Sequence, residues 1–381
     1  MIDSLDLLKK LISFRSVTPQ DDGSIDHIAS ILKNYGFTVY IKTFGPNNVK
    51  NLYAHSHKAE GFKSILLAGH IDVVEPGDGW NSDPFQALEK DGKIYGRGAV
   101  DMKGALSCMI AAGVNLVTSG DLVPNSAVCF LITSDEEGEA EFGTKAMVEW
   151  MDKNGHLSDF AIVGEPTCAS KFGDSIKIGR RGSANFELRI HGMQGHVAYP
   201  NLADNPNSTI IKVLKSLIDL QLDNGDEIFE PSNLEITSID VGNNSTNIIP
   251  SMASAKFNIR FNKNHNEQSL LDLLRKTIEL CTNSYELEYK ISAMPFLSKP
   301  SSFTEILRSV IYEQTNVPCA YSASGGTSDA RFLHSYIEVA EFGLLSGLAH
   351  KINEYTQISH LQRLYNVYYH ALNRIFGYMN L

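Results

Sequence analysis

The sequence predicts an α/β protein in which a mixed-sheet domain carries an inserted, ferredoxin-like α+β domain. Three apolar segments, at residues 65–68, 127–133 and 160–163, alternate with helical patterns, which is typical of strands covered on both faces. Between about residue 183 and residue 293 the pattern changes to β-α-β-β-α-β, the order of a ferredoxin-like domain. A chain of 381 residues is also too long for one comfortable core, so we expect two domains.

The first part of the chain alternates helices with strands. A helix is expected to begin at Ser24 and to end at Asn34 and Gly36, because these residue types cap helices. Asp91-Gly92 between two short strands indicates a hairpin with a type I′ turn. The expected elements are helices at 4–14, 24–34, 102–118 and 142–153, and strands at 37–44, 51–55, 64–70, 85–90, 93–95, 127–133 and 160–163.

The middle of the chain, after Arg180, alternates apolar and polar residues as a half-buried strand does. Its expected elements are a strand around 186–190, a helix at 206–221, strands at 233–241 and 253–261, a helix at 267–282 and a strand at 285–293. The chain then returns to the first domain, with helices at 302–314 and 357–375 and a strand at 337–342. The predicted domains are therefore 1–180 with 296–381, and 181–295.

Composition and charge narrow the classes of function. The chain is 43% hydrophobic and 20% charged, and its net charge of −11 argues against nucleic acid or an anionic membrane as a partner. Five widely spaced cysteines, an odd number, fit reduced thiols better than a disulfide framework. The N-terminus lacks a basic start and a cleavage site, and no run of about 18 apolar residues occurs. We expect a cytoplasmic protein.

Six residues with acidic or imidazole side chains each follow an apolar strand or lie in a glycine-containing turn. They are His70, Asp101, Glu136, Glu137, Glu165 and His350. Because sites in open α/β sheets form at the carboxyl ends of strands, we expect these side chains to meet. Two imidazoles and three carboxylates, without thiolates, suit zinc or a similar ion and suffice for two metals that share one carboxylate. Taken one at a time, the alternatives are a satisfied polar histidine, a helix cap and a solvated acidic turn.

Asp72 follows His70 by two residues. In an extended segment both side chains point to the same side, so Asp72 is predicted to accept the second ring N–H of His70 and to fix its tautomer.

Five motifs carry a resemblance to a known family. They are residues 69–72, 96–104, 134–138, 164–166 and 350–354, and they resemble those of the M20 family of dinuclear metallohydrolases. The resemblance runs from the first helix to the last. It implies that the larger domain is a zinc-hydrolase catalytic domain, that the inserted domain forms a homodimer, and that the peptide between Asp101 and Met102 is cis.

The same resemblance implies a role for each site residue. His70 and Glu165 would bind one Zn²⁺, Glu137 and His350 the other, and Asp101 would lie between them, with Co²⁺ able to replace zinc at one site. Glu136 would be the general base. His196, in the inserted domain, would reach across the dimer to stabilise an oxyanion; the alternative is a surface histidine in a glycine-containing turn.

Three further segments, 180–183, 191–200 and 324–332, resemble the members that release succinate from an N-succinyl diamino-dicarboxylate, a small molecule with three carboxylates. The residues expected to hold these carboxylates are Arg180, Ser183, Asn247, Arg260 and Thr327. Ser346 stands where such members often carry asparagine. The alternatives are another amidohydrolase of the family, such as an acetylornithine deacetylase or a dipeptidase, and a non-catalytic binding member.

Overall fold

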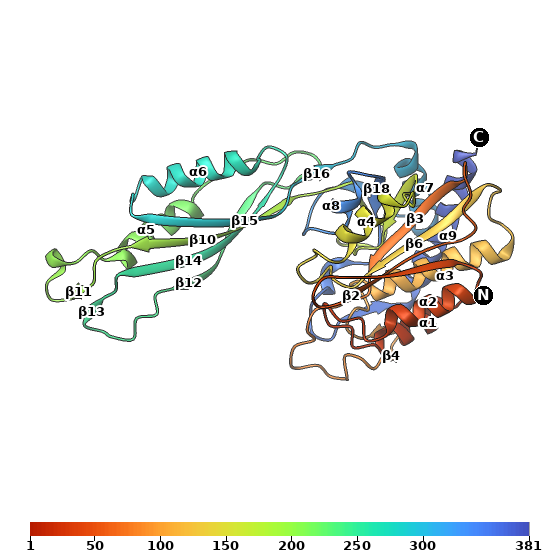
Figure 1. Cartoon of the computed structure of the whole chain (residues 1–381), viewed down its shortest axis with the longest axis horizontal. Coiled ribbons are helices and arrows are strands. Elements are labelled where there is room, and N and C mark those ends of the chain that lie inside the picture. Colours follow the sequence, from red (N-terminus) through yellow and green to blue (C-terminus); the bar gives the residue numbers. More distant parts are fainter. Residues whose placement is uncertain (381) are drawn as a thin grey trace. The chain divides into compact units, whose positions relative to one another are not determined.

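A computed structural model describes residues 1–380 and divides the chain into two units (Figure 1). Unit 1 comprises Met1–Ile178, Ser298–Ser322 and the chain from Ser328 onward. Unit 2 comprises Gly179–Leu297 and Ala323–Thr327. The sequence analysis had assigned this last segment to the larger domain, but its backbone groups with unit 2, where the Ala323 N–H donates to the Ile228 carbonyl at 3.2 Å.

Unit 1 is built on an eight-stranded mixed sheet in the order β1-β2-β6-β3-β7-β18-β8-β17. The strands are β1 (Thr38–Phe44), β2 (Val49–His55), β3 (Lys63–His70), β6 (Ser126–Thr133), β7 (Phe160–Val163), β8 (Ser175–Lys177), β17 (Ala320–Ser322) and β18 (Glu338–Glu341). The four central strands, β6, β3, β7 and β18, run parallel. β2 pairs antiparallel with both of its neighbours, β6 and β1. The predicted mixed sheet is confirmed.

Helices cover both faces of this sheet, which explains why its central strands are apolar throughout. The helices of unit 1 are α1 (Ser4–Ile12), α2 (Ser24–Asn34), α3 (Lys103–Ser119), α4 (Thr144–Lys153), α7 (Ser302–Thr315), α8 (Ala330–Leu333), the 3₁₀ turn η2 (Ser346–Leu348) and α9 (Ile358–Met379). Figure 1 shows α3 and α9 on one side of the sheet and α4 and α8 on the other. Every residue of β6 is buried, as is every residue of α3 from Lys103 to Leu116.

A small three-stranded sheet, in the order β19-β5-β4, precedes the loop that leads into α3. It consists of β4 (Leu88–Lys90), β5 (Lys93–Tyr95) and β19 (Tyr355–Gln357). Asp91 and Gly92 both have positive φ, at 51° and 71°, as the predicted type I′ turn requires. The strand expected at 85–90 begins only at Leu88, because the Phe85 N–H turns back to the Asp83 carboxylate.

Unit 2 contains a four-stranded antiparallel sheet in the order β12-β14-β10-β15. Its elements are β9 (Gly179–Arg180), β10 (Gly182–His191), β11 (Gly195–His196), η1 (Pro200–Leu202), α5 (Pro206–Ile218), β12 (Asn233–Asp240), β13 (Ile248–Ile249), β14 (Met252–Phe261), α6 (Glu267–Glu279), β15 (Tyr285–Ala293) and β16 (Phe296–Leu297). The long elements follow the predicted β-α-β-β-α-β order, and the strand order is that of a ferredoxin-like sheet.

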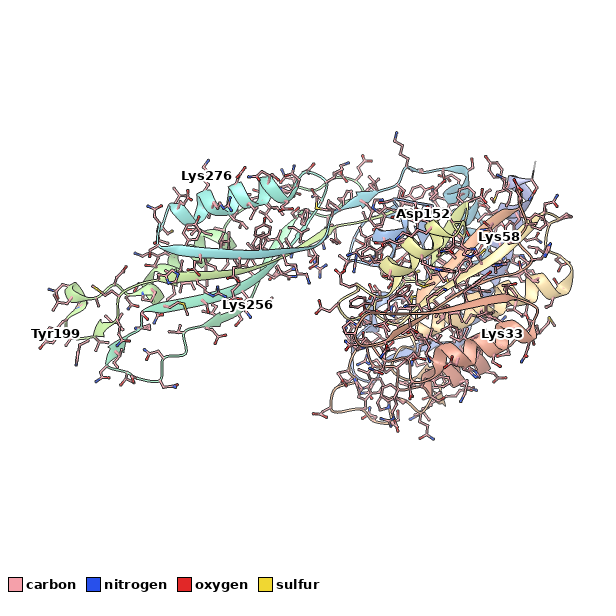
Figure 2. All side chains as sticks on the ribbon, in the orientation of Figure 1. Lys33, Lys58, Asp152, Tyr199, Lys256 and Lys276 are labelled. Atoms are coloured by element: carbon pink, nitrogen blue, oxygen red, sulfur yellow. The ribbon has the colours of Figure 1, made fainter. Side chains whose placement is uncertain are left out.

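The two faces of this sheet differ in chemistry. On the helix-covered face, Phe186 and Phe257 stack with ring centroids 5.1 Å apart within the buried core of unit 2. On the other face, Lys256, labelled in Figure 2, lies 3.8 Å from the Glu187 carboxylate. The alternation of apolar and polar residues that predicted half-buried strands is therefore confirmed.

Several short elements were not predicted: β8, β9, β11, β13, β16, β17, β19 and α8. Each has two to four residues, which is too short for a hydrophobic period to show in the sequence. Within residues 1–380, the structure has no helix that is both long enough and apolar enough to cross a membrane.

Candidate metal centre

The sheet of unit 1 brings the predicted ligand residues to one edge. His70 is the last residue of β3, Glu136 and Glu137 follow β6, and Glu165 follows β7. Because these strands are parallel neighbours, their carboxyl ends meet at the same edge. Asp101 precedes α3 by two residues, and its peptide bond to Met102 is cis, as predicted.

The first group of ligand atoms consists of His70, Asp101 and Glu165, whose candidate atoms all lie within 4.8 Å of one another. His70 Nε2 is 3.3 Å from Asp101 Oδ1 and 3.7 Å from Glu165 Oε1. The His70 side chain is only 1% exposed, so this group lies at the bottom of the site.

The second group consists of Asp101, Glu137 and His350, also within 4.8 Å of one another. His350 Nε2 lies 2.9 Å from Glu137 Oε1 and 3.3 Å from Asp101 Oδ2. Asp101 thus directs one carboxylate oxygen at each imidazole and belongs to both groups. His350 has a φ of +62°, an uncommon backbone conformation that is often found at functional sites.

The residues present fit a pair of divalent cations. Among residues 1–380, the buried atoms His70 Nε2 and Asp101 Oδ1 find no hydrogen-bond partner, although they are 3.3 Å apart. Buried polar atoms without partners are rare in folded proteins and call for an ion or water to satisfy them. Imidazole and carboxylate together are the ligands that zinc prefers in sites without thiolates.

The electrostatics of the cluster also favour a cation. Although burial opposes the shift, the carboxylates of Asp101 and Asp72 raise the pKa of His70 well above its usual range. Asp101 and then Glu137 raise the pKa of His350 to about 10. Burial opposes the shift at Asp101 too, but His350 and His70 hold the pKa of its carboxyl below the usual range. The carboxylates of the cluster therefore stabilise positive charge at the two imidazoles.

Asp72 acts differently from the sequence prediction. The second ring nitrogen of His70, Nδ1, lies 2.9 Å from the Asp72 main-chain carbonyl and 3.6 Å from its carboxylate. The closer partner is thus the main chain of Asp72. Its two carboxylate oxygens accept the main-chain N–H groups of Glu136 and Glu137, at 3.4 and 3.1 Å. Asp72 orients both the imidazole and the acidic turn.

Glu136 lies beside the cluster but belongs to neither ligand group. Burial, and then the negative charge of Glu165, raise the pKa of Glu136 well above its usual range. A carboxylate in such an environment accepts a proton readily, which is what a general base needs near neutral pH.

Glu354 is a residue of the site to which the sequence analysis gave no role. Its side chain is fully buried, and it accepts hydrogen bonds from Arg97 Nη1 at 2.8 Å and from the main-chain N–H groups of Gly98, Val100 and Asp101 at 3.0, 2.7 and 3.1 Å. The signal available in the sequence was an acidic residue four positions after His350 in an otherwise recognised motif.

His196 lies in unit 2, on the short strand β11, which pairs with β13 next to Asn247. The Val197 N–H donates to the Asn247 carbonyl at 3.1 Å, so the structure brings these two predicted regions together. The Ala198 N–H donates to His196 Nδ1 at 3.0 Å, so a neutral ring carries its proton on Nε2. Tyr199, labelled in Figure 2, has its ring 5.7 Å from that of His196. The exposed imidazole therefore presents an N–H donor.

The other predicted substrate residues also lie in unit 2. Ser183 and Arg260 are directly opposite each other on β10 and β14. The buried Arg180 donates from Nη1 to the Gly326 carbonyl at 3.0 Å, which places it beside the segment that contains Thr327. Outside this unit, the Ser346 hydroxyl donates to the Cys168 carbonyl at 3.2 Å.

Paired imidazole and carboxylate groups at the carboxyl edge of an α/β sheet are the donor set of a two-metal site of the kind that metallohydrolases use. Residues 66–374 match the model of peptidase family M20/M25/M40, and the chain belongs to this family.

Relatives and solved structures agree with this assignment over nearly the whole chain. A succinyl-diaminopimelate desuccinylase of Orientia tsutsugamushi (strain Ikeda) is 52% identical over 371 residues, covering 97% of this chain and 95% of the relative. One of Rickettsia bellii (strain RML369-C) is 48% identical over 374 residues, covering 96% and 95%. The crystal structure of an M20 family metallo-carboxypeptidase from Sulfolobus solfataricus superposes with a TM-score of 0.79 at 18% identity, covering 98% of this chain and 99% of that one. That structure supports the fold.

Proposed function

We propose that the chain hydrolyses the succinyl amide of N-succinyl-LL-2,6-diaminopimelate, giving succinate and LL-2,6-diaminopimelate in the biosynthesis of lysine and peptidoglycan precursors. The observation that carries the proposal is the identity of 48–52%, over almost the full chain, to succinyl-diaminopimelate desuccinylases. The two ligand groups and the buried Glu136 carboxylate beside them support catalysis, because a binding member of the fold needs neither.

The proposed cofactor is two Zn²⁺ per subunit, with Co²⁺ able to replace one of them. His70 and Glu165 would hold one ion, Glu137 and His350 the other, and Asp101 both; the two overlapping ligand groups support this division. When bound, the ions supply Lewis acidity to the amide carbonyl and acidify water.

The protein's own groups carry the proton. Glu136 takes a proton from the attacking water as the new C–O bond forms and delivers it to the nitrogen of the leaving amine as the C–N bond breaks. The products are a carboxylic acid and an amine, which ionise to carboxylate and ammonium at neutral pH. The raised pKa of its carboxyl supports this role, because the proton is held firmly enough to be kept between the two transfers. Asp72 orients the Glu136 main chain through the hydrogen bond at 3.4 Å.

The substrate brings three carboxylates, for which Arg180, Ser183, Asn247, Arg260 and Thr327 are the proposed partners. The pairing of Ser183 with Arg260 supports one subsite, since a hydroxyl and a guanidinium together suit a carboxylate. The exposed His196, with its proton on Nε2, is proposed to donate to the developing oxyanion from the second subunit of a homodimer. We place the enzyme in the cytoplasm, without nucleic acid or membrane partners, in keeping with its net charge of −11.

The test compares hydrolysis of succinyl-diaminopimelate with that of acetylornithine and a dipeptide by the zinc-loaded protein. We expect kcat/KM to be highest for succinyl-diaminopimelate. Faster hydrolysis of acetylornithine or of the dipeptide would assign the chain to another amidohydrolase of the family. Binding of all three without turnover would favour a non-catalytic member.

A further inference from the structure

Asp329 lies in a segment of unit 1 to which the proposed function gives no role. Its carboxylate is buried, and Oδ2 accepts a hydrogen bond from the Thr144 hydroxyl at 2.5 Å. The Thr133 hydroxyl lies 3.3 Å from the same oxygen and 3.2 Å from the Thr144 hydroxyl. Both threonines are buried, so the three side chains form a closed group shielded from water.

The two threonines lie at opposite ends of the acidic turn. Thr133 is the last residue of β6, and Thr144 is the first residue of α4. The turn between them, residues 134–143, carries Glu136 and Glu137. One carboxylate from a distant part of the chain therefore ties together both ends of the turn that holds the proposed base and a proposed metal ligand.

Helix capping does not explain Asp329. An aspartate that directly precedes a helix normally accepts the helix's first N–H groups. Asp329 precedes α8, yet it has helical dihedral angles (φ −61°, ψ −18°), and within the described chain its side chain makes no capping hydrogen bond. The carboxylate instead reaches the two threonines.

Burying this carboxylate is costly. Burial raises the pKa of Asp329, and Oδ1 has no hydrogen-bond partner among residues 1–380. A buried carboxylate with one unsatisfied oxygen needs an explanation beyond stability, since apolar residues of similar shape pack as well or better.

The rest of the turn is held by other carboxylates. Asp72 accepts the N–H groups of Glu136 and Glu137 in its middle, and Asp135 Oδ2 accepts the Phe142 N–H at 2.9 Å near its end. These bonds hold the inside of the turn. Asp329 instead contacts Thr133 and Thr144, the two residues that flank the turn.

We propose that Asp329 is a positioning residue: through Thr133 and Thr144 it sets the place of Glu136 and Glu137 at the metal centre. The proposal rests on the proposed function in so far as Glu136 is the base. Misplacing a reacting group by about 1 Å can reduce turnover roughly 100-fold, so a small displacement of this turn is enough to be measured.

The experiment uses full-length, zinc-loaded protein and the variant Thr144→Val, which removes the hydroxyl and keeps the shape of the side chain. Thr144→Ser restores the hydroxyl. The control is Thr304→Val, because Thr304 is also a buried threonine in the first turn of a helix, α7. Its hydroxyl contacts the carbonyl and the N–H of the N-cap residue Ser301, at 3.1 and 2.9 Å, and the Tyr321 hydroxyl at 2.9 Å. We expect Thr144→Val to lower kcat about 10- to 100-fold with little change in KM, and Thr144→Ser to recover most of it. Thr304→Val should lose a similar amount of thermal stability with unchanged kcat.

A second readout does not depend on the substrate. Amide hydrogen exchange in peptides covering residues 134–143 should be faster in Thr144→Val than in the wild type and in Thr304→Val. Unchanged exchange in this turn, or a kcat equal to that of Thr304→Val, overturns the positioning role. If the wild type fails to hydrolyse the succinyl substrate, the proposed function fails. Even then, faster exchange in Thr144→Val supports the positioning of the turn by Asp329, and unchanged exchange overturns it.

Discussion

Glu354 Oε1 accepts the main-chain N–H of Asp101 at 3.1 Å, and so links the carboxylate shared by both ligand groups to the segment that carries His350. The same side chain holds Arg97 through Oε2 at 2.8 Å, and both partners of this pair are almost completely buried. Two residues that lie 253 positions apart in sequence thereby fix the glycine-rich loop in front of α3.

Replacing Glu354 by glutamine is expected to destabilise the protein strongly. Glutamine keeps one acceptor oxygen for four donors and leaves the Arg97 guanidinium buried without a counter-charge. Breaking a buried ion pair in this way costs about 3–5 kcal/mol. Urea denaturation of the metal-free protein measures the loss.

The matched control for this prediction is Glu313→Gln. Glu313 makes two hydrogen bonds with Arg374, both at 2.8 Å, but the pair is about half exposed. Exposed pairs contribute roughly 0–1 kcal/mol, so the control should be nearly neutral. Equal losses in the two variants would show that the Glu354 bonds contribute no more than an exposed pair does.

The two histidines of the cluster should contribute stability to the metal-free protein that is lost as pH rises from neutral to alkaline. The folded-state pKa of His350 is about 10, against 6.5 for the unfolded chain, so the folded state binds more protons between these values. This contribution is fully present below pH 6.5 and is lost as pH rises through about 10. The shift at His70 has the same direction. Urea denaturation at several pH values measures the slope, and His350→Gln should reduce it.

Metal reverses this dependence, because a histidine ligand must be neutral to bind an ion. The apparent affinity for Zn²⁺ should therefore rise with pH, and binding should release protons. Calorimetry in buffers of different ionisation enthalpy detects that release. A pH dependence between pH 7 and pH 10 that is the same in His350→Gln as in the wild type, or zinc binding without proton release, would contradict the assigned ion pairs.

Neighbouring carboxylates of the acidic turn should give opposite results when removed. Glu136→Ala is expected to keep two metal ions per chain and to lose activity about 10²- to 10⁴-fold, because a base is lost and no ligand is. Glu137→Ala should bind less metal. Metal content after dialysis separates the two variants, and metal loss in Glu136→Ala with full occupancy in Glu137→Ala would exchange their roles.

Chelation should abolish wild-type hydrolysis, and added Zn²⁺ should restore it.

The sequence predicted well those features that depend on periodicity and strand ends. β3, β6 and β7 are apolar because helices cover both faces of their sheet, and this pattern shows in a single sequence. Since parallel strands end at one edge, the meeting of His70 and Glu165 could be predicted from their positions after apolar strands.

Features that depend on tertiary contacts were not visible in the sequence. The strands β8, β17 and β19 have three residues each and exist because a neighbouring strand pairs with them. Which atom of Asp72 meets His70 depends on the local path of the backbone, which places the main-chain carbonyl closer than the carboxylate. The role proposed for Asp329 requires knowing that its segment meets the turn between β6 and α4, and no local pattern encodes that.

His196 provides the most specific test of the homodimer. It belongs to unit 2, whereas Glu136 belongs to unit 1, and we predict that each active site combines Glu136 of one subunit with His196 of the other. A hydrogen-bond donor to an oxyanion contributes about 2.7–4 kcal/mol to transition-state stabilisation. His196→Ala should therefore lower kcat by about 10²- to 10³-fold and leave the metal content unchanged, and Glu136→Ala should be inactive as well.

Mixing the two inactive variants decides between a site within one chain and a site shared by two. With subunit exchange in a symmetric dimer, half of the dimers are mixed, and one of the two sites in each mixed dimer has both residues intact. About a quarter of all sites should then work, and activity should return as the subunits exchange. If both residues act within one chain, every site lacks one of them and the mixture stays inactive. Absence of activity, with exchange shown independently by two differently labelled subunits, would assign the action of His196 to its own chain, because every site in the mixture then lacks one of the two residues. A surface histidine without a role would instead show itself as an active His196→Ala variant.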